Sequence, residues 1–401
     1  MSGRRGALAV AGRCAIAAAL AAASPRTGAA QLGPLSGYLL NVAGVSGSSV
    51  FSVGGASDFQ RLRLMLAPTL GPLRFEGAYE QLFLYQQRPG AAFTALTPGS
   101  SSASGEWLDL DWTLARRGDV LWRHRFDRLD LALAGNGVEA RIGRQAISWA
   151  TTLLLTPADP FAPFDPSDPF REYRSGVDAA RLQYFPGPFS SLDLVVRPMR
   201  TPRGRTLIAA ARGKLTLGAL DLSAWGGVAY GDPAGAVGAT GTVAGAAWRS
   251  EVSLRRDSAG ALVVRGAAGL DRRWSVFGRD LYAIVEYQHD GYAAARASDL
   301  IAVLSSAPYQ RGELQALGRD VAAAELQYQV HPLVSLELLA LADLRDGSVL
   351  LAPGASLSAS NDLTVRAGAY LSAGRGAGLA GLGSEFGAVP RFGYGSVSLF
   401  F

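Results

Sequence analysis

The sequence has very few residues of the kinds that build thiol or metal chemistry. Its one cysteine, Cys14, lies within the first 30 residues, so residues 31–401 contain none. Disulfides, cysteine metal ligands and a cysteine nucleophile are therefore excluded from that part of the chain. The three histidines, His124, His289 and His331, are far apart in sequence and lack metal-ligand spacing. We therefore expect no metal and no other cofactor.

Long hydrophobic runs are also absent after residue 30, although hydrophobic residues make up 49% of the chain. A membrane-spanning helix needs roughly 20 consecutive apolar residues. A membrane β-barrel needs no such run, because polar residues facing the lumen alternate with apolar residues facing lipid. The 49 glycines suit tight turns and closely approaching strands better than helices.

Residues 1–30 have the pattern of a secretory signal peptide. Arg4 and Arg5 precede an apolar stretch at 7–23, and small residues end the segment at Ala30. The segment carries four arginines and no acid, so its removal lowers the formal net charge from +5 to +1. The basic balance of the whole chain thus gives no support for a nucleic-acid partner. We predict a signal peptide at 1–30 and a single domain at 31–401.

Apolar and polar residues alternate with period two through most of the remaining sequence. In residues 281–288 leucine, alanine, valine and tyrosine lie on one face, opposite tyrosine, isoleucine, glutamate and glutamine. Residues 106–114, 247–255 and 321–330 alternate in the same way. Many charges on one strand face would disfavour a buried sandwich, whereas in a barrel that face meets water in the lumen. The sequence predicts an all-β transmembrane antiparallel barrel of about 18 strands (16–18).

Turns and loops divide these strands into a pattern typical of outer-membrane barrels, with short connections at one end and long ones at the other. Short turns are expected at 135–137, 186–188, 331–332 and 360–362, and long loops at 45–57, 87–104, 150–176, 231–240, 291–318 and 374–390. Counting strands from the two termini places loop 150–176 at opposite ends. The ambiguity lies in residues 115–134, which hold either one strand or two.

The C-terminal residues are typical of the last strand of a bacterial barrel. Val397, Leu399 and Phe401 alternate with small polar residues up to the end of the chain. With the signal peptide, this pattern predicts recognition by the barrel-assembly machinery and a bacterial outer-membrane location. The neighbours expected there are membrane lipid and lipopolysaccharide, and an oligomer is possible.

One loop is unusually rich in proline and aspartate. Prolines recur at every third position from Pro157 to Pro169, the spacing of a polyproline II turn. In that form the phenylalanines would pack on the wall, and the aspartates would face water. Folded into the lumen, the loop would narrow it; the alternatives are a rigid surface loop and a periplasmic or plug-like segment. The candidate constriction residues are Asp159, Asp165, Asp168, Arg171, Glu172 and Arg174.

The strand before this loop resembles a motif of known barrels. Residues Arg141 to Trp149, which read Arg-Ile-Gly-Arg-Gln-Ala-Ile-Ser-Trp, resemble the Gly-Arg-Gln…Trp strand of porin-like outer-membrane families, including alginate-export-type barrels. In those families a glycine often follows the tryptophan, whereas here it is Ala150. The resemblance covers about residues 120–200 and implies a barrel that passes a substrate.

We therefore predict a non-enzymatic porin-like channel for a polar small solute or polymer. Arginines and acids on opposite lumen walls would create a transverse field that orients the solute. The alternatives are an exporter of a polysaccharide or other polymer, a barrel enzyme acting on lipid, and a closed structural or adhesion barrel. The candidate pore-wall residues are Arg61, Arg63, Glu139, Arg141, Gln145, Arg181, Gln183, Arg249 and Arg255.

Overall fold

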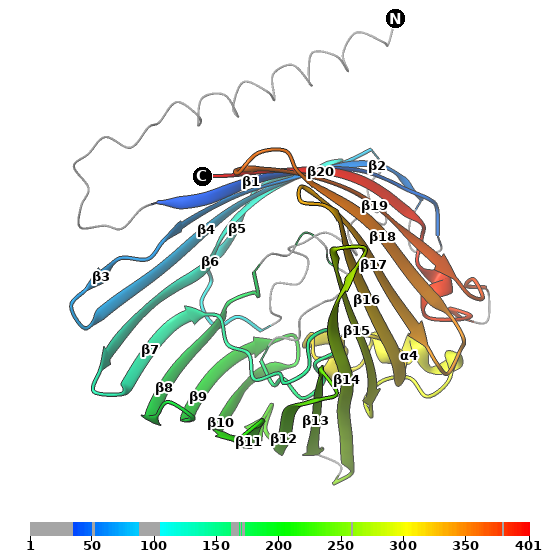
Figure 1. The fold of residues 1–401 in the computed structure, drawn as a ribbon. Helices are drawn as coiled ribbons and strands as arrows, with labels where there is room; N and C mark the ends of the chain where they lie inside the picture. Colours follow the sequence, from blue (N-terminus) through cyan, green and yellow to red (C-terminus); the bar gives the residue numbers. More distant parts are fainter. Residues whose placement is uncertain are drawn as a thin grey trace, which may run out of the picture.

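One antiparallel sheet curls round and closes on itself in the computed structural model of this protein (Figure 1). The structure describes residues 35–49, 53–87, 105–161, 168, 170, 173–257, 260–378 and 381–401. The predicted signal peptide lies outside these residues. So do three of the predicted constriction residues, Asp165, Arg171 and Glu172.

Apart from the short β3 and β5, the strands follow one another round the barrel in sequence order, each paired with the next. Their bounds are β1 Ser36–Ser46, β2 Gly55–Leu66, β3 Thr69–Leu70, β4 Leu73–Gln86, β5 Asp111–Arg117, β6 Val120–Gly135, β7 Val138–Gln145, β8 Val177–Gly187, β9 Ser190–Thr201, β10 Gly204–Leu217, β11 Leu220–Ala229, β12 Asp232–Val243, β13 Ala246–Arg256, β14 Leu262–Val276, β15 Arg279–Asp290, β16 Asp320–His331, β17 Val334–Asp343, β18 Val349–Ser358, β19 Leu363–Ala373 and β20 Phe392–Phe400. Short helices lie between β15 and β16 and before β20: η1 Ala297–Asp299, α4 Leu300–Leu304, α5 Ala307–Gln310 and η2 Phe386–Ala388.

The barrel closes where the first strand meets the last. Leu39 of β1 pairs with Leu399 of β20, and the two strands stay in register from Tyr38 to Ser46. Among the described residues, eighteen strands form the closed wall, which confirms the predicted fold and strand number. The two-residue β3 extends the β2–β4 hairpin. The short β5 pairs with β6 alone.

Strand β5 explains why counting strands from the two termini placed loop 150–176 at opposite ends of the barrel. Residues 111–135 fold as a hairpin in which only β6 belongs to the wall over its full length, because β4 and β7 pair with β6 directly. With β5 set aside, the long connections after β1, β4, β7, β15 and β19 all lie at one end of the barrel. The start of β1, the end of β20 and the short turns at 136–137 and 188–189 lie at the other. In outer-membrane barrels the end with long loops is extracellular.

The prediction of a loop at 231–240 is wrong, because these residues form most of β12. Residues 234–243 pair with β13 without interruption, from Ala234 opposite Arg255 to Val243 opposite Ala246. Glycine and alanine dominate this strand, and they gave its sequence the appearance of a loop.

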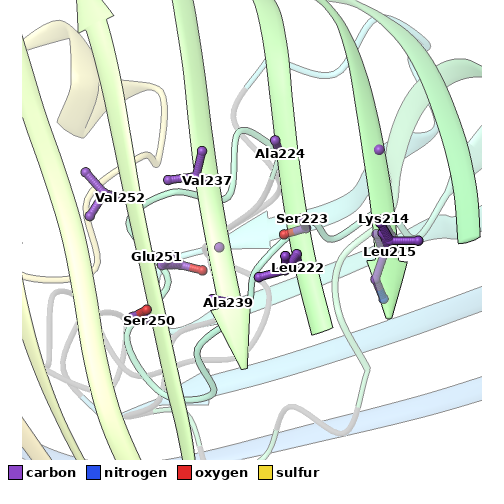
Figure 2. A pocket seen from close by; sticks show the side chains of 12 residues that line it. Lys214, Leu215, Leu222, Ser223, Ala224, Val237, Ala239, Ser250, Glu251 and Val252 are labelled. Atoms are coloured by element: carbon purple, nitrogen blue, oxygen red, sulfur yellow. The ribbon is translucent and has the colours of Figure 1, made fainter. Parts of the chain in front are cut away.

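The two faces of the wall have opposite chemistry, as the alternation predicts. On β9, Leu192, Leu194 and Val196 are exposed on the outside, while Asp193 and Arg197 are buried inside. A cavity of about 570 Å³ lies against β10–β13, where outward-facing Leu222, Val237 and Val252 stand beside glycine and alanine (Figure 2). No helix in the described residues is long and apolar enough to cross a bilayer.

Part of the lumen is filled rather than open. Leu154, Leu155 and Phe170, from the connection between β7 and β8, pack in one cluster with wall residues such as Tyr38 and Leu82. A second, smaller cluster joins the connection that carries α4 to the connection before β20. Folded loops therefore occupy the inside and the extracellular end of the barrel.

Gly143, in the Gly-Arg-Gln motif, has a backbone conformation that other residues rarely adopt. Its φ is +121°, and a Cβ placed there would lie 2.3 Å from the carbonyl oxygen of Leu129 and 2.9 Å from Cα of Asp130. Glycine at this position lets β7 lie close to β6 near the point where β7 ends and the chain leaves the wall.

We predict that Gly143→Ala lowers barrel stability by about 1–3 kcal/mol, the usual cost of a strained backbone position. The measurement is the temperature at which the folded band is lost in heat-modifiability electrophoresis. Gly213→Ala on β10 is the matched control, because a Cβ there meets nothing within 4 Å. Equal melting of the two variants would contradict the role given to Gly143.

Candidate functional site

The described residues of the connection from β7 to β8 (146–161, 168, 170 and 173–176) turn into the barrel instead of covering its rim (Figure 1). Trp149 begins the inward path: its ring is 3% exposed, and its Nε1 donates to Asp193 of β9 at 2.9 Å. Phe161 packs edge-on against the same ring, with centroids 4.8 Å apart. We call the described part of this connection the inner loop.

Glu251 on β13 holds the first part of the inner loop. Its carboxylate accepts the backbone N–H groups of Thr151 at 2.6 Å, Thr152 at 3.3 Å and Ala158 at 3.0 Å. Glu251 is 2% exposed. Buried backbone N–H groups need acceptors, and an ionised carboxylate is a strong one. The wall therefore supplies hydrogen bonds that an irregular loop cannot make for itself.

Glu286 on β15 has the same role one step further along the loop. It accepts the N–H groups of Leu153 at 2.7 Å, Leu154 at 2.9 Å and Leu155 at 2.8 Å. Glu286 is also 2% exposed. The three leucine side chains meanwhile pack with the apolar cluster of the lumen. The loop is thus held by hydrogen bonds from its backbone and by packing of its side chains.

Further hydrogen bonds attach the inner loop to other parts of the barrel. Gln315 accepts the N–H of Thr156 at 2.6 Å, and Trp225 Nε1 donates to the carbonyl of Ala158 at 3.2 Å. Arg197 donates to the carbonyl of Phe161. Arg61 on β2 donates to the carbonyl of Phe170 at 3.0 Å. The inner loop is therefore tied to walls on several sides of the barrel.

The predicted constriction residues that the structure describes are mostly buried. Asp159 is 3% exposed, accepts from Ser148 Oγ at 2.7 Å and lies 3.4 Å from Arg174 Nη1. Burial raises the pKa of the Asp159 carboxyl above its usual value. Asp168 is 8% exposed and accepts the N–H of Phe170 at 3.0 Å. The sequence predicts that these two aspartates face channel water, whereas in the structure both are buried. They are buried because each accepts a backbone N–H within the loop and so holds its fold.

The polyproline form predicted from Pro157 does not begin there. The N–H of Asp159 donates to the carbonyl of Thr156 at 3.2 Å, and Asp159 in turn accepts the N–H of Phe161 at 3.1 Å. These bonds close tight turns, which break a regular three-residue rotation. Residues 162–167 lie outside the described part of the chain.

All nine predicted pore-wall residues occupy inward-facing strand positions, but they differ in exposure. Four are buried by neighbouring loops or ion pairs: Arg61, Arg63, Gln145 and Arg255. The other five are partly exposed: Glu139, Arg141, Arg181, Gln183 and Arg249. Arg181 pairs with Asp193 at 2.6 Å and Arg249 with Asp271 at 3.0 Å.

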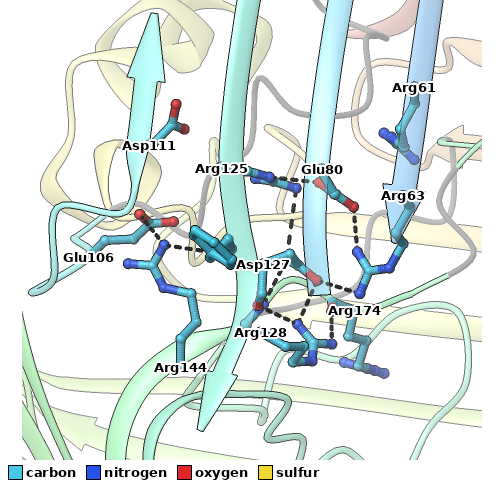
Figure 3. Close-up of polar contacts among 12 residues, drawn as sticks. Arg61, Arg63, Glu80, Glu106, Asp111, Arg125, Asp127, Arg128, Arg144 and Arg174 are labelled. Atoms are coloured by element: carbon cyan, nitrogen blue, oxygen red, sulfur yellow. Dashed lines mark hydrogen bonds and ion pairs between the residues drawn. The ribbon is translucent and has the colours of Figure 1, made fainter. Parts of the chain in front are cut away.

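A dense ion-pair network stiffens one wall (Figure 3). Glu80 of β4 pairs with Arg63 of β2 and with Arg125 of β6, the latter at 2.7 Å. Asp127 pairs with Arg63 at 2.9 Å and with Arg128 at 2.7 Å, and it accepts the N–H of Gly176. All the side chains in these pairs are nearly inaccessible. The network links three strands to the end of the inner loop.

Arg144 is a structural residue that the sequence argument did not single out. Its guanidinium binds Asp178 at 2.8 Å and Glu106 at 2.9 Å, and it donates to the carbonyls of Phe126 and Leu108. These partners come from β8, from the segment before β5 and from β6. Arg144 therefore joins these three segments at the point where β7 ends. It is 1% exposed. The motif position was the only sequence signal for it.

The space beside the inner loop is lined by basic groups. A cavity of about 180 Å³ lies between Ala150 and Thr151 of the loop and the wall of β10–β13, and its lining includes three basic residues, Arg212, Lys214 and Arg249, and one acid, Asp221. Lys214 is the only lysine of the chain. Within the described residues, neither Arg212 nor Lys214 forms an ion pair with a carboxylate. Figure 2 shows Lys214, Ser223 and Glu251 on neighbouring strands of this wall.

The extracellular loops are joined by a buried carboxylate. Glu385, in the connection before β20, accepts the N–H groups of Leu317 at 2.6 Å and Gly318 at 2.8 Å. Its own N–H donates to Asp346 at 2.6 Å. Burial, together with the charges of Asp343 and Asp346, raises the pKa of Glu385 to about 7 despite the two N–H groups, which lower it.

No site for a metal ion emerges in the part of the chain that the structure describes. No group of three or more potential acidic or histidine ligands comes together there. His289 Nδ1 lies 2.8 Å from Asp320, and His124 Nδ1 lies 3.0 Å from the Tyr79 hydroxyl.

The closed wall, the apolar outside and the inner loop together define the class of fold: a transmembrane β-barrel with a loop folded into its lumen. Solved structures with the same fold include OccAB1 of Acinetobacter baumannii, with a TM-score of 0.53, 9% identity and coverage of 92% of this chain and 97% of that chain. OccK2 (OpdF) of Pseudomonas aeruginosa has a TM-score of 0.52, 12% identity and coverage of 92% and 98%.

OccK1 (OpdK) of Pseudomonas aeruginosa is a third example, with a TM-score of 0.51, 10% identity and coverage of 92% of this chain and 99% of that chain. No family model matches the chain, and no curated protein matches it. At these identities the likeness establishes the fold alone.

We predict that Glu286→Ala loosens the inner loop. The change leaves three N–H groups without their acceptor, at a cost of about 1–3 kcal/mol for each one that stays buried. Single-channel recording should show a larger and noisier conductance, and protease should cut near residue 154. Glu325→Gln on β16 is the control, because its described bond is to Gln327. Identical traces for Glu286→Ala and the control would contradict the anchoring role.

We predict that contact between the loop before β20 and the loop after β15 weakens as pH rises from about 5 to 8. The pKa of Glu385 in the folded state, about 7, lies above the usual value of 4.5 for a glutamate, so the folded state binds the extra proton. The stabilisation is therefore full at low pH and lost through this range, by up to about 3 kcal/mol. Hydrogen exchange of Leu317 and Gly318 should accelerate accordingly, and Glu385→Gln should flatten the pH dependence. Exchange that slows with rising pH, after correction for intrinsic rates, would contradict it.

Proposed function

We propose that this protein is a channel through which small polar solutes cross the outer membrane, with the inner loop as its constriction. The observation that carries the proposal is the anchoring of the loop. Two wall carboxylates, Glu251 and Glu286, each take three backbone N–H groups of the loop. A loop held so firmly inside a barrel narrows the lumen at a fixed place, which suits selection by size and charge.

The proposed route runs between the inner loop and the wall of β10–β13. Arg212, Lys214 and Arg249 line the cavity there and outnumber its one acid, Asp221; the hydroxyl groups of Ser223 and Thr240 also line it. Such a surface attracts an anionic group and offers hydrogen bonds in place of its water. One protein of the same fold, OpdK, was crystallised with vanillate, which is a carboxylate. We therefore propose that the solutes include small organic anions.

The alternative roles find less support. Export of a polymer, as the alginate-export-like resemblance implies, needs a wide continuous passage, whereas here the inner loop crosses the lumen. An enzyme acting on lipid would need an activated nucleophile. Within the described residues, no serine hydroxyl bonds to His124 or His289, whose partners are Tyr79 and Asp320. We also propose, from its terminal pattern, that β20 is recognised by the barrel-assembly machinery before it pairs with β1.

We predict that purified protein conducts ions in planar bilayers and prefers anions. Replacing the single lysine, Lys214→Gln, should shift the reversal potential in a salt gradient toward cations, because one uncompensated positive charge leaves the narrow region. Arg205→Gln, on the outer face of the same strand, is the control and should leave the reversal potential unchanged.

Deletion of residues 157–170 tests the constriction itself. The deletion should raise the conductance and weaken the ion preference, since it removes much of the obstacle in the lumen. A lack of current in every variant would remove the channel proposal. Unchanged conductance after the deletion would leave a channel but overturn the constriction.

A further inference from the structure

Two arginines on the outside of the barrel face each other directly. Arg200 is the last outward residue of β9, and Arg205 is the first outward residue of β10; their Cα atoms are register partners. The outward positions below them are apolar, with Pro198 opposite Leu207 and Val196 opposite Ala209. Both arginines are exposed. They therefore lie where the apolar belt ends, at the extracellular rim.

Like charges at directly opposed positions of an antiparallel pair repel each other and destabilise the sheet. Within the described residues, neither guanidinium forms an ion pair with a carboxylate. The undescribed stretch that directly precedes Gly105 and Trp107, residues 88–104, contains no aspartate or glutamate. The turn between the two strands carries Arg203, whose guanidinium donates instead to the carbonyl of Ser305 at 3.0 Å and to Gln310 at 3.4 Å. The described residues thus place two positive charges side by side at this point and supply no carboxylate that pairs with either.

An aromatic ring holds the two arginines in place. The guanidinium carbon of Arg200 lies 4.8 Å from the ring centroid of Trp107, and that of Arg205 lies 5.6 Å from it. The tryptophan is fixed by its backbone N–H, which donates to Asp178 at 2.7 Å. The N–H of Arg200 also donates to the carbonyl of Gly105 at 3.3 Å. The site is therefore ordered before any ligand arrives, and a tryptophan at this level suits the membrane interface.

We propose that Arg200, Arg205 and Trp107 form a binding site for a phosphate group of the glycolipid that makes up the outer leaflet, lipopolysaccharide. A phosphate between the guanidinium groups neutralises their repulsion and accepts charge-assisted hydrogen bonds from both. The acyl chains of the same lipid would lie along the apolar belt below, over Leu207 and Val196. A soluble anion would lack this second contact, so the position of the site favours a lipid.

The test uses the whole protein in detergent freed of native lipid. The probe is lipid A, compared with the same lipid after removal of its phosphate groups and with inorganic phosphate alone. Phosphorylated lipid A should raise the temperature at which the folded electrophoretic band is lost. The Arg200→Gln, Arg205→Gln double variant should show little of this rise and bind the lipid about tenfold or more weakly by native mass spectrometry. In lipid-free detergent the double variant should be no less stable than the parent protein, because the repulsion between the two arginines has been removed. This measurement also checks that the double variant folds.

Arg272→Gln is the matched control variant. Arg272 also faces outward and lies over a tryptophan, 5.5 Å from the ring of Trp274, but at the opposite end of the barrel. It should keep the full response to lipid A. Three results would overturn the proposal: an equal rise for the double variant, an equal rise with the dephosphorylated lipid, or a rise reproduced by inorganic phosphate alone. The last would mark a site for free anions.

Discussion

The interior of this barrel depends on satisfying backbone hydrogen bonds where no regular structure supplies them. The inner loop brings N–H groups into a buried space, and each would cost free energy if left without an acceptor. Glu251 and Glu286 accept six of them, three for each carboxylate. Because each acid is fixed on a strand of a closed wall, the loop is fixed as well. Its leucines and Phe170 can then fill the lumen without leaving polar groups unpaired.

The charged side chains on the inner face of the wall fall into two groups, according to whether they are paired with one another. Glu80, Asp127 and the arginines around them are buried and paired, so they stiffen the wall and compensate one another. Lys214 and Arg212, at the edge of the cavity beside the loop, have no carboxylate paired with them in the described residues. Charges of the first kind hold the barrel together, and charges of the second kind remain available to a solute. Arginine suits the first role because its planar group binds several acceptors at once.

The sequence predicted the elements that depend on local pattern and missed those that depend on distant contacts. Period-two alternation was sufficient for the barrel and its strand number, because each strand must face both lipid and lumen. It failed at β12, where glycine and alanine conceal the alternation. The acids that hold the inner loop stood on strand faces already recognised as polar. However, Glu251 and Glu286 lie about 100 and 130 residues from the groups they bind, and no local pattern reveals such a partner.

The Gly-Arg-Gln…Trp motif acquires a physical meaning from these contacts. Gly143 lets β7 approach β6, Arg144 seals the wall where β7 ends, and Gln145 donates to the carbonyl of Ala179 at 3.0 Å. Trp149 then fixes the start of the inner loop through Asp193. Each role concerns how a chain leaves the wall and turns inward, and none requires contact with a solute. In this chain the motif therefore accounts for the inward turn of the loop and not for the choice of solute. Selectivity is then left to residues outside the motif, such as those of β10–β13 that face the loop.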